Sequence, residues 1–404
     1  MLDFTITKRK LSSFIALLAF LQAGLWYGGL ADLIPVALLN QWNRLTLIFS
    51  VILAFLCIAR KRKINIATAV IVLFKVIFIL STYINGRTVD KVEFTRFLCI
   101  VLSLEYFEDE LDSIVTVLML VCELMVYYNL VTLSVGPDLY GAYYTALGYD
   151  NAAPPYLLAA YFVAICFSFE KRKYIRTIIL IVAIHATLLI TMVGTGLVAV
   201  FFVDILLIWN LIKSIELTLI KTYVINIIFT FFIVVCRIQN LFSFIIVDML
   251  GKDLTFTGRT RDWDLAFELI TQRLLLGYGS MNQATEKIVL GDAFTHNGLL
   301  ELVFRGGIIA LFIFTMAIYF VSKVERFVSE ESKNKSRILL CVLCGYWIMS
   351  VTEVVFEGVV FYCALMLYFH YIKFLSIREK KYMVSTACKC NLVGDKRKSN
   401  VFYF

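Results

Sequence analysis

The sequence predicts an all-α polytopic membrane protein with about 12 transmembrane helices and one large extracytoplasmic loop. Composition leads to this fold class first: the 404 residues are 61% hydrophobic, only 17% are charged, and mean hydropathy is +0.84. Soluble domains are closer to half apolar and a quarter charged. The other two observations are a succession of long apolar runs and a single long polar stretch, residues 257–305, late in the chain.

Apolar runs of roughly 17–25 residues cross the hydrocarbon core of a bilayer as helices. A weaker run covers residues 94–107, and without it the basic cluster at 60–63 would face the wrong side, so we retain it as a span. The clear runs cover residues 12–30, 44–60, 64–84, 111–134, 155–170, 174–192, 194–212, 217–236, 298–321, 338–355 and 356–374.

Basic clusters give the orientation, because Lys and Arg are enriched on the cytoplasmic side. When the segment after Tyr371 is placed inside, every basic cluster between the spans also falls inside, and both termini are predicted to be cytoplasmic. The clusters lie at residues 8–10, 60–63, 171–173, 213–221 and 323–337. The acidic segment 105–110 is predicted to lie on the same side.

The chain is accordingly divided into four parts. They are an N-terminal transmembrane bundle of about nine spans (1–236), an extracytoplasmic catalytic loop with an amphipathic helix (237–297), C-terminal transmembrane helices (298–374) and a basic cytoplasmic tail (375–404). The connections predicted to be cytoplasmic are short and carry no phosphate-binding glycine motif between a strand and a helix, which excludes a nucleotide as the direct substrate. The net charge of +8 reflects the basic clusters rather than a nucleic-acid surface.

The polar stretch is predicted to contain a short amphipathic helix over residues 261–276, packed on the membrane face. Its apolar residues have helical spacing: Trp263, Ala266, Phe267, Ile270 and Leu274. The turn Gly277-Tyr278-Gly279 ends it, because glycine adopts positive φ without strain.

Arg259 and Arg261 lie at the start of this helix, where the helix dipole disfavours cations. Free N–H groups and two guanidinium groups at one place favour an anionic partner such as a phosphate. The alternative is that both arginines contact lipid headgroups or pair with Asp253 and Asp262.

His296 and Asn297 begin the next span. Asn297 is a good N-cap, and the start of a helix favours a neutral imidazole that can accept a proton. A purely structural His296 is the alternative. Glu301 and Arg305 follow Asn297 on the same helical face, either as a self-neutralising pair or as the lining of a polar cavity.

Other charged residues receive simpler interpretations. Arg87 is expected on the outer side, where it reaches an anionic headgroup or extends to lipid phosphates. Glu353 and Glu357 are interpreted as solvated residues of an outer turn, and the alternative is that they border the same polar cavity as Glu301 and Arg305. His370 is expected at the cytoplasmic membrane interface, and Cys341 with Cys344 as helix packing.

Together these residues resemble the O-antigen polymerase and ligase superfamily (the Wzy and WaaL families). The resemblance covers residues 257–307 and rests on Gly258-Arg259, Trp263, Gly277-Tyr278-Gly279, His296-Asn297 and Gly306-Gly307. Many relatives also place an arginine in the segment that corresponds to 191–200, and this chain has none there.

The resemblance implies a GT-C-like architecture and a metal-independent, inverting glycosyl transfer at the outer face of the bacterial cytoplasmic membrane. Donor and acceptor would be undecaprenyl-diphosphate-linked glycans. The implied site has three sets of residues: catalytic His296, with Glu301 in reserve; diphosphate-binding Arg259, Arg261, Arg87 and Arg305; and positioning Trp263, Gly277, Gly279 and Asn297. No metal ligand or cofactor is expected.

We therefore predict a polymerase of surface polysaccharide, either O-antigen or capsule. A ligase that transfers finished glycan to a lipid A core or a protein is the nearest alternative, and a lipid-linked glycan flippase or other transporter is the alternative from another class. Expected partners are lipid-linked glycans, membrane lipids and a chain-length regulator protein, and no nucleic acid.

Overall fold

The computed structural model describes residue 14 and residues 35–61, 64–133, 136–137, 143–214, 216–238, 258–291 and 294–398. The predicted first span, 12–30, lies outside the described residues apart from Phe14. Most of the segment 237–257, with Asp253, also lies outside them, as does the end of the predicted basic tail.

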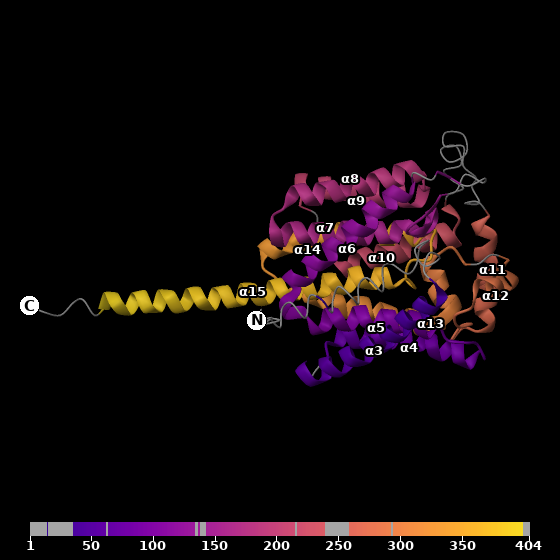
Figure 1. The fold of residues 1–404 in the computed structure, drawn as a ribbon, viewed down its shortest axis with the longest axis horizontal. Coiled ribbons are helices and arrows are strands. Elements are labelled where there is room, and N and C mark those ends of the chain that lie inside the picture. Colours follow the sequence, from indigo (N-terminus) through magenta and orange to yellow (C-terminus); the bar gives the residue numbers. More distant parts are fainter. Residues whose placement is uncertain are drawn as a thin grey trace, which may run out of the picture.

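Within these residues the chain is a bundle of long helices (Figure 1). Its sheet is one small hairpin of two-residue strands, β1 (Tyr144–Thr145) and β2 (Gly148–Tyr149). The helices that form the bundle are α3 (Val36–Lys61), α4 (Ile66–Ile84), α5 (Lys91–Tyr106), α6 (Leu111–Thr132), α7 (Ala153–Lys171), α8 (Tyr174–Thr191), α9 (Gly194–Ile212), α10 (Leu219–Thr230), α13 (Gly298–Ser322), α14 (Glu330–Met349) and α15 (Val359–Lys398). Short helices α11 (Arg259–Gln272) and α12 (Gln283–Leu290) lie at one end, and α15 extends past the other (Figure 1).

The predicted fold class is confirmed, although fewer helices than expected are long and apolar enough to cross a membrane. Among the described residues there are 8 such helices. The run 94–107 forms α5, which has only 16 residues, and the run 217–236 forms a shorter apolar helix, Leu219–Val235, that ends in a π-helical turn. The run 338–355 belongs to α14, whose first turns are charged.

The distribution of apolar side chains agrees with a bilayer around the bundle. Large aliphatic residues point outward from the outer helices, including Ile175, Leu211 and Ile212, each more than three-quarters exposed. Aromatic residues such as Tyr346, Phe361 and Tyr362 are instead buried at the centre. An outward apolar surface of this extent is stable only against lipid or another apolar partner.

Helix α13 packs along α4 and is interrupted at Gly307, whose φ of 67° and ψ of −173° are not helical. The interruption frees backbone groups, and the segment after α11 binds them. Ile308 donates its N–H to the Leu274 carbonyl at 2.9 Å, while Tyr278 and Gly279 donate to the carbonyls of Phe304 and Arg305 at 2.8 and 2.7 Å. A broken helix at membrane depth requires such internal partners.

Replacing Gly307 by alanine is expected to destabilise this junction. A Cβ at Gly307 would lie 2.1 Å from the Leu275 carbonyl oxygen, and the positive φ adds about 1–3 kcal/mol of strain. We expect a clear fall in the apparent melting temperature of the protein purified in detergent. Gly194→Ala is the matched control, because a Cβ there meets nothing within 4 Å; equal stability of both variants would contradict the role of the break.

Candidate active site

Arg259, the first residue of α11, binds the turn between α14 and α15. Its Nη1 donates to the carbonyl of Thr352, and its Nη2 donates to the carboxylate of Glu353 at 2.8 Å. The side chains of Arg259 and Glu353 are each 17% exposed, so the pair lies at the edge of the protein and not in its core. Glu353 was expected to be solvated, and it instead holds the first arginine of the polar stretch.

The start of α13 binds the same turn. Asn297 caps α13, as predicted, by accepting from the Leu300 N–H at 2.9 Å, and its amide donates to the Val351 carbonyl at 2.9 Å. Gly298 donates its N–H to the Ser350 carbonyl at 2.7 Å. Residues 350–353 therefore bring the Arg259 end and the His296-Asn297 end of the polar stretch together.

His296 has a strained backbone. Its φ of 50° lies in the left-handed region, which a residue with a Cβ adopts at a cost. The ring is half-buried and lies edge-on to Phe294, with ring centroids 6.3 Å apart. Strain of this kind is concentrated at functional sites, because surrounding contacts must hold the residue in place.

The predicted amphipathic helix exists as α11, and one side of it packs on α13. Trp263 is fully buried, and together with Ala266 and Ile270 it packs against Leu300 and Phe304 of α13. Phe267 and Leu274, which the sequence pattern places on the same apolar stripe, remain exposed. Trp263 therefore fixes α11 on α13, and this contact positions the first turn of α11.

Arg305 lies beside the interruption in α13 and is only 6% exposed. Its guanidinium contacts three carboxylates: Glu301 one turn earlier, Glu286 of α12 at 2.8 Å, and Glu357 of the turn before α15 at 2.5 Å. Glu301 also accepts from the Thr295 N–H at 2.9 Å. We refer to Glu286, Glu301, Arg305 and Glu357 as the Arg305 cluster.

Lys75 of α4 extends the Arg305 cluster. Its ammonium donates to the Glu357 carbonyl at 2.7 Å and to the carboxylate of Glu93 at 3.1 Å. Lys75 and Glu93 line a small pocket together with Phe78 and Ser280. The cluster therefore joins α4, α5, α12 and α13 with the turn before α15.

These contacts place two of the predicted site residues, Arg305 and Glu301, inside the Arg305 cluster, apart from Arg259 and Asn297 at the turn 350–353. Arg305 and Glu301 were expected to bind diphosphate and to serve as a reserve base, yet both are buried and bound to each other. Glu357, expected to be solvated, is a third member of the cluster. The sequence pattern gave no reason to select Glu286, Lys75 or Glu93, because only the fold brings them to Arg305.

Arg261 and Arg87 lie apart from the cluster. Arg261 is exposed in the first turn of α11, near Gly291 at the end of α12. Arg87, in the loop after α4, donates to the Tyr278 carbonyl at 2.5 Å, so it holds the Gly277-Tyr278-Gly279 turn. Gly277 and Gly279 have the positive φ expected of them, and a Cβ on Gly277 would lie 2.5 Å from the Phe304 carbonyl oxygen.

Burial in the Arg305 cluster changes the acidity of its carboxyl groups. Burial raises the pKa of Glu286 to about 9, with the neighbouring Glu301 adding to the effect and Arg305 opposing it. Burial likewise raises the pKa of Glu357 to about 8. Three carboxylates around one guanidinium exceed its charge, so the cluster retains a proton near neutral pH.

Fold and site together define an α-helical polytopic membrane protein with polar loop residues gathered at one end of the bundle. Residues 158–315 match the family model described as O-antigen ligase. This match confirms the predicted resemblance to the O-antigen polymerase and ligase superfamily, and the matched residues include Arg259, Arg261 and His296. No curated protein matches the chain.

The raised pKa of Glu286 predicts the pH dependence of stability. Its pKa is higher in the folded protein than the ordinary 4.5, so the stability that it contributes is complete below about 4.5 and is lost as the pH rises through about 9. We expect the apparent melting temperature to fall over this range. Glu286→Gln, which resembles the protonated form, should flatten the fall, and an unchanged slope would contradict the assignment.

Proposed function

We propose that this protein polymerises undecaprenyl-diphosphate-linked oligosaccharide repeat units into surface polysaccharide, either O-antigen or capsule. The transfer is inverting and metal-independent, as the resemblance implies, and takes place at the outer face of the bacterial cytoplasmic membrane. The family match supports a glycosyl-transfer role in general. The basic end of α15, which leaves the bundle opposite α11 and α12, supports the orientation with the site outside.

One observation carries this proposal: Arg259, Asn297 and Gly298 bind consecutive residues of the turn 350–353, and His296 directly precedes Asn297. An anion-binding group and a candidate base thus belong to one place, although 36 residues lie between Arg259 and His296 in the chain. Glycosyl transfer from a lipid diphosphate needs these two groups at the two sides of the bond that is exchanged.

In the proposed reaction, a hydroxyl of the acceptor glycan attacks the anomeric carbon of the donor while the bond to the diphosphate oxygen breaks. His296 takes the proton of the attacking hydroxyl. Arg259 and Arg261 bind the diphosphate and stabilise the negative charge that develops on it as it leaves. Glu353 holds Arg259 until the donor arrives. We assign Arg305 and Glu301 to holding the break in α13 and Arg87 to holding the glycine turn.

A ligase is the second candidate, and a specific observation favours it, since the matched family is described as O-antigen ligase. The same residues serve either reaction, because the donor is a lipid-linked glycan in both. The two differ in the acceptor, which is another lipid-linked glycan for a polymerase and a lipid A core or a protein for a ligase.

Deleting the gene distinguishes the candidates. Loss of a polymerase leaves single repeat units on the carrier or on the core, without long chains. Loss of a ligase leaves long chains on the lipid carrier, and loss of a flippase traps single units on the cytoplasmic side. The last result would refute the proposed enzyme, and the sugar content of carrier-linked and surface glycan measures all three.

Arg259→Ala and His296→Ala, returned to the deletion strain, are expected to lower polymer formation by roughly 100-fold or more, because each removes a group acting on the transferred bond. Membrane levels of both proteins should stay normal. Arg337→Ala, at the opposite end of α14, and His185→Gln in α8 are the matched controls and should make wild-type chains. Wild-type chain length in both site variants would refute the site.

Glu353→Gln tests how Arg259 is held. The neutral side chain keeps its size and still accepts a hydrogen bond from Arg259, but it loses the ion pair of 2.8 Å. We expect shorter or fewer chains than in the wild type and a smaller loss than in Arg259→Ala. A loss as large as that of Arg259→Ala would show that Glu353 itself takes part in the transfer.

A further inference from the structure

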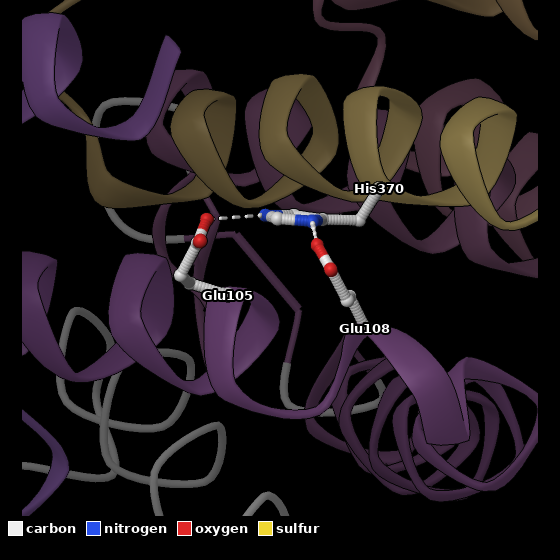
Figure 2. A group of neighbouring side chains, drawn as sticks. All are labelled: Glu105, Glu108 and His370. Carbon is white, nitrogen blue, oxygen red and sulfur yellow. Dashed lines mark ion pairs between the residues drawn. The ribbon is translucent and has the colours of Figure 1, made fainter. Parts of the chain in front are cut away.

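At the end of the bundle opposite α11 and α12, the side chain of His370 lies between two carboxylates. His370 belongs to α15, Glu105 to α5, and Glu108 to the 3-10 turn that follows it (Figure 2). His370 and Glu105 are fully buried, which corrects the expectation that His370 lies at the membrane interface. One ligand atom from each of the three residues lies within 4.8 Å of the other two.

Neither ring nitrogen of His370 makes a hydrogen bond with the described residues. Nδ1 lies 3.3 Å from a Glu108 oxygen, and Nε2 lies 3.6 Å from a Glu105 oxygen. A neutral imidazole carries one N–H, so it can satisfy only one of these carboxylates, and its other nitrogen then faces a second acceptor across the gap. A cation bound between that nitrogen and the second carboxylate would satisfy both acceptors.

The two carboxylates are held differently. Glu105 accepts hydrogen bonds from Asn65 at 2.7 Å and from Thr68 at 2.5 Å, so it is fixed and suited to accept the N–H of His370. Glu108 accepts from Lys373 at 3.1 Å and more weakly from Asn65 at 3.3 Å, and the side chain of Lys373 is 29% exposed. Glu108 and Lys373 also line a pocket of about 180 Å³, which offers a path for an ion and its water.

We propose that Nδ1 of His370 and the carboxylate of Glu108 bind a divalent transition cation, with Glu105 orienting the imidazole through Nε2. For metal bonds of about 2.1 Å at a tetrahedral angle, two ligand atoms lie roughly 3.4 Å apart, close to the 3.3 Å between Nδ1 and Glu108. An imidazole nitrogen among the ligands favours a divalent transition cation over Ca²⁺ or Mg²⁺, which prefer oxygen ligands, and Mn²⁺ serves as the probe because it accepts both nitrogen and carboxylate ligands. A bound carboxylate on the second ring nitrogen is the usual partner of a metal-binding histidine.

The charges around His370 favour the binding of a cation. Glu105 and Glu108 bring two negative charges into a largely buried place, and Lys373 brings one positive charge. The ion would link α15 to the corner between α5 and α6, far from the proposed transfer site. This inference does not depend on the proposed function.

The test uses the full-length protein in detergent, treated with a chelator and then titrated with Mn²⁺. Bound Mn²⁺ is measured as the loss of the magnetic resonance signal of the free aqueous ion. A Cys388→Ser, Cys390→Ser background removes the paired thiols of the basic tail as competing ligands. We expect one Mn²⁺ per chain, and a melting temperature that rises with Mn²⁺.

His370→Gln and Glu108→Gln should each weaken Mn²⁺ binding by roughly 10-fold or more, and Glu105→Gln should weaken it by about 10-fold. His185→Gln is the matched control and should bind like the parent. If His370→Gln does not yield folded protein, Glu108→Gln decides. Failure of the parent to bind Mn²⁺ would mean that a proton on His370 joins the two carboxylates, and that result, like equal binding by parent and Glu108→Gln, overturns the proposal.

Discussion

The interruption of α13 at Gly307 is the constraint on which the candidate site depends. It leaves the carbonyls of Phe304 and Arg305 without helical partners, and such groups are costly inside a membrane. The backbone of residues 274–279 satisfies them, with Ser81 of α4 donating a further hydrogen bond of 2.9 Å to the Arg305 carbonyl. Because this backbone follows directly from α11, the break determines where α11 ends and therefore where its first residue, Arg259, lies.

The Arg305 cluster secures the same junction through side chains. A buried guanidinium with a single carboxylate gains little, since desolvation of both charges offsets their attraction. Arg305 instead contacts three carboxylates that come from α12, from its own helix and from the turn before α15. Breaking one contact leaves charge uncompensated in a buried place, so the cluster specifies one arrangement of these segments. Glu357 of the cluster and Glu353, which binds Arg259, lie on the same short connection.

Local sequence patterns were sufficient to predict several of the elements around the candidate site. Helical spacing of Trp263, Ala266 and Ile270 located α11, the N-cap preference of asparagine located the start of α13, and the spacing of Glu301 and Arg305 gave their contact. The partners Glu286 and Lys75 lie on other elements, so no local spacing indicated them. The same limit misled the interpretation of His370, whose position near the end of an apolar run suggested an interface, while its burial depends on α5 and the following turn.

The existing contacts and the exposure of each arginine indicate which of them can bind a diphosphate. The guanidinium of Arg305 already binds three carboxyl groups, so it is not available to a further anion at a place where it is only 6% exposed. Arg259 has one carboxylate partner, lies at the edge of the protein, and begins a helix whose free N–H groups favour an anion. A diphosphate that replaces Glu353 at Arg259 exchanges one anionic partner for another and adds the exposed Arg261. The cost of desolvation is therefore smallest at the start of α11, which is the reason for placing the leaving group there.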